Sequence, residues 1–150
     1  MQEGLDGIIS GLYININNME GILIFGRIIV GGYFIMSGIN HFTGLAGMTG
    51  YAQSKGVPMA KWGVILSGIL LFLGGLGILL GAYVVWSIAL LIVALLPITF
   101  MIHSFWKIED PMAKMGDRVN FMKNMGLIGL LLIIAATYTA DWMMALNWVM

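Results

Sequence analysis

The chain has 150 residues, of which 60% are hydrophobic and 9% are charged, and its formal net charge at pH 7 is zero. An average soluble domain carries about 25% charged residues, so this composition indicates an integral membrane protein whose first partners are membrane lipids. The zero net charge gives no indication of nucleic acid as a partner. The absence of cysteine excludes disulfides, thiol redox chemistry and cysteine-ligated metal or iron–sulfur centres.

Residues 1–20 form a segment that precedes the long apolar runs. Leu5, Ile8, Ile9, Leu12 and Ile16 recur at helical spacing, which indicates a short interfacial helix lying on the outer membrane surface. Three glycines and three asparagines interrupt this pattern, and they favour a frayed tail instead. Both interpretations of residues 1–20 stay open on the sequence.

Four apolar windows follow, and each has about the 20 residues that a membrane-spanning helix needs. Their bounds are about 21–39, 62–80, 83–102 and 121–140. Residues 21–150 are therefore predicted to form one all-α membrane domain, an antiparallel bundle of four transmembrane helices. The short connection "LLGAYVV" predicts a tight hairpin between the second and third spans. Pro97 lacks the N–H that would reach the Val93 carbonyl, so a kink is expected in the third span.

The charged residues predict how the bundle is oriented in the membrane. Glu3, Asp6, Glu20 and Asp141 flank the spans on the side of the two termini, where there is no lysine. Lysine-rich loops are typical of the cytoplasmic side, so both termini are expected outside a membrane that we take to be the prokaryotic cytoplasmic membrane. The five lysines and Arg118 all lie in or beside the other two connections: Lys55, Lys61, Lys107, Lys114, Arg118 and Lys123.

One face of the first span is polar and is predicted to point into the bundle. Arg27, Ser37 and His41 lie on this face together with Val30 and Phe34. A charge inside a membrane is a functional-site hypothesis by default. The alternative for Arg27 is that its long side chain snorkels to the outer headgroups and pairs with the Glu20 carboxylate.

A second stripe, in the 62–80 window, consists of small residues. It runs through Gly63, Ser67, Gly74, Gly77 and Gly81. Small residues at this spacing let helices approach closely, so we interpret the stripe as a packing surface.

Polar residues also gather where the first and third spans end and the fourth begins. One interpretation is that they cap helix ends. The other is a ligand site for a quinone or lipid head group, in which imidazoles and amides donate hydrogen bonds and an imidazole relays a proton. Binding of haem or copper by the two histidines is less favoured than a quinone or lipid site. The sequence implies no covalently held cofactor, and we assign no metal ligands. The residues of this predicted site are Asn40, His41, His103, Trp106, Lys123 and Asn124.

Several stretches resemble the DoxX family of small four-helix membrane proteins over about residues 21–136. They are "GRIIVGGYFIMSGINHF", "GYAQSKGVP", "LSGILLFLGGLGILLG", "HSFWKIEDP" and "NFMKNMGLIG". Within the resemblance, Arg27 matches a basic residue near the start of the first span, and Ser67 stands where many relatives carry a glutamate. The H-x-F-W and F-x-K-N patterns of one branch are matched by His103, Phe105, Trp106, Lys123 and Asn124.

The resemblance implies a link to quinone-coupled sulfur oxidation, as in thiosulfate:quinone oxidoreductase, or to terminal quinol oxidase complexes. We therefore expect a subunit of a larger redox-linked membrane complex, with protein partners and an accessory or quinone- or lipid-binding role. A catalytic quinone-reducing subunit is the first alternative, so the sequence does not decide whether the chain is itself an enzyme. The second alternative is a small transporter, which would require Arg27 to line a water-filled path.

Overall fold

The computed structural model describes the backbone of residues 2–138 and the side chains of residues 20–138, and this part of the chain is helical without any strand. Four segments are long and apolar enough to cross a membrane: Glu20–Thr43, Ala60–Leu80, Val84–Lys107 and Pro111–Thr137. The predicted all-α membrane fold is confirmed. The elements in chain order are α1 (Gln2–Thr43), α2 (Leu45–Ser54), α3 (Ala60–Leu80), α4 (Val84–Pro97), the π-helical segment η1 (Ile98–Ile102), the 3-10 turn η2 (Phe105–Lys107) and α5 (Pro111–Thr137).

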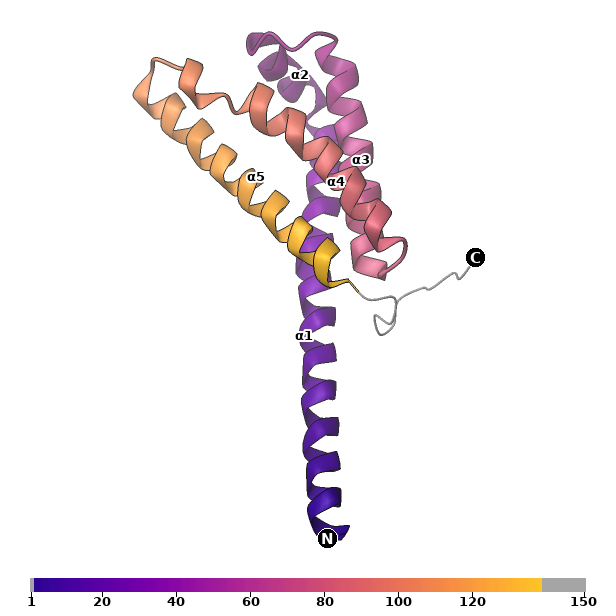
Figure 1. Ribbon diagram of the computed structural model, residues 1–150. Helices are drawn as coiled ribbons and strands as arrows, with labels where there is room; N and C mark the ends of the chain where they lie inside the picture. Colours follow the sequence, from indigo (N-terminus) through magenta and orange to yellow (C-terminus); the bar gives the residue numbers. More distant parts are fainter. Residues whose placement is uncertain (1, 139–150) are drawn as a thin grey trace.

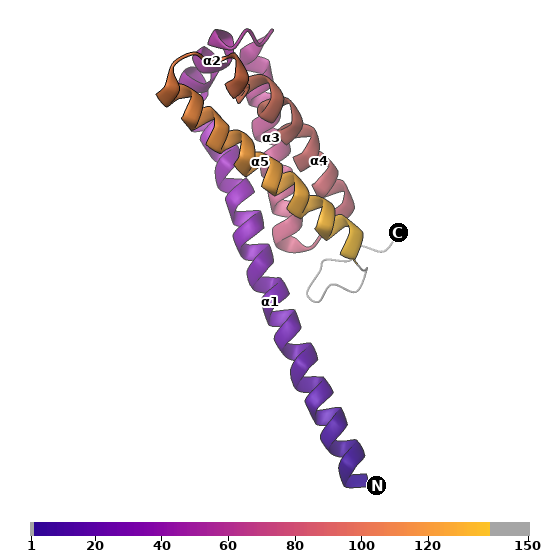
Figure 2. The same ribbon diagram turned by 60° about the vertical axis from the view of Figure 1, so that its left-hand side comes forward.

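The four long helices alternate in direction, so the bundle is antiparallel (Figure 1). α1 packs mainly on α3, α3 on α4, and α4 on α5. The short helix α2 and the η segments lie at one end, which we call the α2 end, and the α3–α4 connection lies at the other, the hairpin end (Figures 1 and 2). Large apolar side chains from all four helices form the core between these ends, among them Phe34, Leu71, Leu91 and Leu131.

Two element bounds differ from the sequence prediction. Residues 2–20 continue α1 beyond the bundle as one helix, so no separate surface helix precedes the first span (Figure 2). α5 begins at Pro111 rather than near residue 121, because the Asp110 side chain accepts a 2.7 Å hydrogen bond from the Ala113 N–H and caps the helix. Pro111 at the first helical position suits this start. The predicted end of the span at residue 140 and the position of Asp141 lie outside the described residues.

Glycines bring the backbones of α1 and α3 into direct contact. Gly31 and Gly38 of α1 face Gly75 and Gly68 of α3, and a Cβ atom at either α1 position would lie 2.8 Å from the facing carbonyl oxygen. On another face of α3, a Cβ at Gly74 would lie 2.6 Å from the Leu91 side chain of α4. Gly74 of the predicted small-residue stripe thus packs on α4, whereas the contacts with α1 come from Gly68 and Gly75, which lie outside that stripe, and a Cβ at Gly63 of the stripe meets nothing within 4 Å.

The tight hairpin forms as the sequence indicates, and the third span changes its helix type at the proline. α3 ends at Leu80 and is capped by Gly81, whose φ of 66° is readily adopted by glycine, and α4 begins three residues after this cap, at Val84. At the far end of α4, the helix changes from α to π directly after Pro97. The His103 N–H then donates to the Ile98 carbonyl at 3.2 Å. This wider turn brings the chain to His103 at the α2 end.

Candidate functional site

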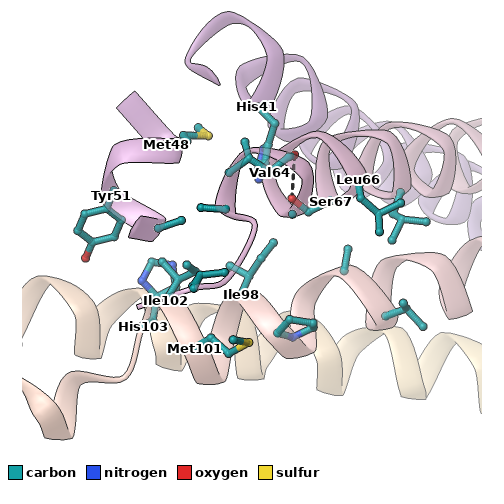
Figure 3. Close-up of a pocket in the computed structure, with 18 of the residues that line it drawn as sticks. His41, Met48, Tyr51, Val64, Leu66, Ser67, Ile98, Met101, Ile102 and His103 are labelled. Atoms are coloured by element: carbon teal, nitrogen blue, oxygen red, sulfur yellow. Dashed lines mark hydrogen bonds between the residues drawn. The ribbon is translucent and has the colours of Figure 1, made fainter. Parts of the chain in front are cut away.

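A cavity of about 570 Å³ occupies the α2 end of the bundle. Its wall is mainly apolar and comes from α2, α3, α4 and η1, together with the last turn of α1 (Figure 3). Four of the large lining residues are strongly exposed: Tyr51 at 44%, Leu66 at 57%, Val93 at 59% and Met101 at 43%. Leu66, Val93 and Met101 belong to segments long and apolar enough to span a membrane, so this part of the cavity wall reaches the surface of the bundle between α3 and the third span.

Two histidines reach this cavity from distant parts of the chain. Figure 3 shows His41 and His103 approaching it from α1 and from the segment after η1. The His41 Nδ1–H donates to the Ser37 carbonyl one turn back at 2.7 Å. On the α3 wall, the Ser67 hydroxyl donates to the Val64 carbonyl at 3.0 Å. Both side chains are therefore anchored to their own helices.

Asp117 of α5 connects the second histidine to α2. It is only 4% exposed. Its Oδ1 accepts a 2.8 Å hydrogen bond from the Tyr51 hydroxyl and lies 3.2 Å from the His103 Nδ1. Its Oδ2 lies 2.5 Å from the Lys55 Nζ. We call Tyr51, Lys55, His103 and Asp117 the Asp117 network, and it joins α2, the end of the third span and α5.

The protonation states of the two α2-side groups fit this arrangement. Burial and the hydrogen bond to Asp117 raise the pKa of the Tyr51 phenol, which therefore stays protonated at neutral pH. Burial alone would lower the pKa of Lys55, but its hydrogen bonds with Asp117 and Tyr51 outweigh burial and raise that pKa. An ammonium at Lys55 favours the ionised carboxylate of Asp117. Because a carboxylate only accepts hydrogen bonds, the His103 Nδ1 carries a proton in this contact.

Of the six residues predicted from the sequence, the structure brings His41 and His103 to one cavity, and the other four do not line it. Asn40 is exposed on α1. Trp106 packs edge-on against Phe105 and Phe121. The Lys123 ammonium donates to the side-chain oxygen Oδ1 of Asn120 at 3.2 Å. Asn124 is buried in α5, at 4% exposure.

Arg27 points into the bundle near the hairpin end, so the snorkelling interpretation is wrong. Its side chain is buried, at 6% exposure. The guanidinium donates from Nε to the Ile78 carbonyl at 3.2 Å and from Nη2 to the Leu79 carbonyl at 2.9 Å. These carbonyls belong to the last turn of α3, where arginine often satisfies carbonyls that a helix end leaves unpaired. Arg27 also lines a second cavity, of about 370 Å³, between α1 and α5.

The sequence interpretation missed Tyr51, Lys55 and Asp117 as site residues. A signal for Asp117 existed, because it lies three residues before Asn120 and seven before Asn124. These positions share one face of a helix. Treating residue 117 as part of a loop concealed this relation.

Comparison with known proteins identifies the family. The family model of DoxX matches residues 22–104, which is more than half of the chain. The matched region contains His41, Tyr51, Lys55 and His103, whereas Asp117 lies beyond it. The comparison with curated proteins gave no match, and the comparison with solved structures gave none either. The chain is therefore a member of the DoxX family, an integral membrane protein built as a bundle of four apolar helices.

Proposed function

We propose that this DoxX protein is a subunit of a redox-linked membrane complex and that it binds the head group of a quinone-type lipid. One observation carries the proposal: a mainly apolar cavity reaches the bundle surface between α3 and α4, within the candidate spans, and has two imidazoles at its wall. Its volume of about 570 Å³ falls in the range of roughly 300–1,000 Å³ usual for ligand pockets. A membrane-dissolved ligand enters such a cavity sideways without crossing water.

The subunit role follows from the electrons that quinone chemistry requires. Conversion between a quinone and its hydroquinone transfers two electrons and two protons. The chain has no cysteine to carry electrons, and no group of three or more His, Asp or Glu side chains in residues 20–138 is placed to hold a metal. We therefore assign the electrons to a partner protein, while this chain holds the head group.

A catalytic role is the second candidate, and the contact between His103 and Asp117 favours it. An imidazole hydrogen-bonded to a carboxylate can relay a proton between a ligand and the solvent side of the bundle. The two roles differ in what His103→Ala does. An accessory subunit predicts unchanged turnover per assembled complex, whereas a catalytic subunit predicts loss of turnover. The transporter alternative has less support, since two α3 carbonyls hold the Arg27 guanidinium.

The proposal is tested by purification from native membranes in mild detergent. Mass spectrometry of the co-purifying proteins, an optical spectrum and extraction of bound lipids are measured on the same sample. We expect a cofactor-bearing partner and about one quinone-type lipid per chain. A lone chain without a partner, chromophore or extracted quinone would contradict both parts of the proposal.

A pair of glycine variants tests whether the cavity holds the extracted lipid. Gly63 lines the cavity, and a Cβ atom there meets no other atom within 4 Å. Gly63→Leu should therefore fill part of the space without disturbing the helix, and the extracted quinone should fall by about tenfold. Gly32→Leu is the matched control, because a Cβ at Gly32 also meets nothing within 4 Å and this residue is not in the cavity wall. Equal loss of quinone in both variants would place the lipid elsewhere.

A further inference from the structure

We propose that the cavity binds the reduced, hydroxyl-bearing hydroquinone in preference to the quinone, because its polar side chains offer hydrogen-bond acceptors and hold their own protons in other bonds. The inference rests on the proposed function and adds which redox form the site takes. Four polar side chains line the cavity: His41, Tyr51, Ser67 and His103.

Two of these side chains use their protons within their own helices. A carbonyl oxygen can only accept a hydrogen bond, so the 2.7 Å contact with the Ser37 carbonyl requires a proton on the His41 Nδ1. In a neutral imidazole the other nitrogen, Nε2, then carries a lone pair. The Ser67 hydroxyl likewise gives its single proton to the Val64 carbonyl, and its oxygen lone pairs remain available as acceptors.

The other two side chains give their protons to Asp117. The Tyr51 hydroxyl donates to Oδ1 at 2.8 Å, and the His103 Nδ1–H faces the same oxygen at 3.2 Å. The Lys55 ammonium on Oδ2 favours the ionised carboxylate, which has no proton to return. The phenol oxygen of Tyr51 is consequently an acceptor as well, and so is the Nε2 of His103 when its imidazole is neutral.

A wall with this pattern distinguishes the two redox forms of one ring. A quinone carries two carbonyl oxygens, which can only accept hydrogen bonds. When a quinone is bound, the lone pairs of both imidazoles therefore have no donor to pair with. A hydroquinone carries two hydroxyl groups, which can donate to them. Each unmade hydrogen bond at such a wall should weaken binding by roughly fivefold or more, so with two imidazoles unpaired the quinone should bind at least about tenfold less tightly than the hydroquinone.

Asp117 is then a positioning residue, because it fixes which nitrogen of His103 is protonated without lining the cavity itself. An asparagine at this position can present its NH₂ group to the Nδ1 of His103. That contact would favour the tautomer with the proton on Nε2, which could donate to a quinone carbonyl.

The test uses the full chain in lipid nanodiscs under anaerobic conditions, with menadiol, menadione and menadiol dimethyl ether as probes. Tryptophan fluorescence gives the three dissociation constants, and nitrogen NMR of histidine-labelled protein reports the tautomers directly. We expect menadiol to bind at least tenfold more tightly than the other two probes, and an unprotonated Nε2 on both histidines. Asp117→Asn should reduce the preference for menadiol and move the His103 proton to Nε2.

Asp110→Asn is the matched control, since it makes the same change at the exposed cap of α5, where asparagine also caps well. It should leave the preference unchanged, and the NMR tautomers of the unaltered chain keep the inference testable if Asp117→Asn does not fold. Equal affinity for menadiol and menadione, or equal affinity for menadiol and its dimethyl ether, would overturn the preference while leaving a quinone-type site in place. Protonated Nε2 atoms in the unaltered chain would also overturn it. Failure of all three probes to bind would overturn the preference and the proposed function together.

Discussion

The two ends of the bundle each bury one charged side chain, and they neutralise it in different ways. At the α2 end, Asp117 is held by the side chains of Tyr51, Lys55 and His103, which come from different segments. At the hairpin end, Arg27 donates to the backbone carbonyls of a single helix turn. Both charges are at most 6% exposed, so burial alone does not distinguish their roles.

The difference lies in what can change around each charge. Backbone carbonyls have one protonation state, so the hydrogen bonds from Arg27 to Ile78 and Leu79 fasten α1 to the end of α3 without depending on the protonation of a partner. Side chains can gain or lose protons and rotate, and two partners of Asp117, Tyr51 and His103, also line the cavity. This contrast marks Asp117 as part of a site and Arg27 as part of the scaffold, and the following variants can break or sharpen it.

The largest effect is expected from Asp117→Ala. The substitution leaves the partly buried Lys55 ammonium and two hydrogen-bond donors without their acceptor, and the loss should approach the roughly 3–5 kcal/mol that losing one partner of a fully buried ion pair costs. Thermal unfolding in detergent should show a large loss of stability together with loss of ligand binding. Glu109→Ala removes a nearby exposed carboxylate and should have little effect on either. A wild-type melting temperature for Asp117→Ala would show that the network contributes nothing to the fold.

The sequence was sufficient to predict the bundle, because its spans are long and the glycine positions repeat at helical spacing. It also predicted that His41 and His103 lie at the same end, since antiparallel helices bring the ends of the first and third spans together. The start of α5 was missed because Lys114, Asp117 and Arg118 resemble a polar loop. The partners of Asp117 could not be found by periodicity, because they lie 62 to 66 residues away on α2 and 14 away beyond η1.

The next effect in size is expected from Arg27→Met, which keeps the length of the side chain and removes its charge. Two charge-assisted hydrogen bonds are lost, and a total cost of about 3 kcal/mol is expected from their usual strength. Because Arg27 does not line the α2-end cavity, the preference for menadiol should persist in the protein that folds. Arg118→Met, at an exposed position of α5, is the control for loss of charge. A changed redox preference in Arg27→Met would mean that the two ends are coupled.

Two glycine substitutions on α1 compare the hairpin end with the α2 end of the bundle, because both glycines make the same close backbone contact with α3. Gly31→Ala and Gly38→Ala each place a Cβ 2.8 Å from a carbonyl oxygen of α3, and overpacking of this kind costs about 2 kcal/mol. The stability losses should be similar. Only Gly38→Ala should also weaken menadiol binding, because Gly38 contacts α3 near His41, whose Cβ lies against Gly68. Gly32→Ala, which meets no atom within 4 Å, should lose neither property, and equal binding losses at positions 31 and 38 would contradict the division between the ends.

The smallest effect concerns pH and separates the titratable end from the fixed one. The pKa of Lys55 is raised above its usual 10.5, so the folded chain holds this proton more tightly than the unfolded chain. The stabilisation is therefore fully present below about pH 10 and is lost as the pH rises through the folded pKa. Melting temperatures measured from neutral pH upward should fall more steeply for the unaltered chain than for Lys55→Met. Lys61→Met, which removes an exposed lysine, should retain the steep fall, whereas parallel curves for all three proteins would mean that the ammonium of Lys55 does not stabilise the α2 end.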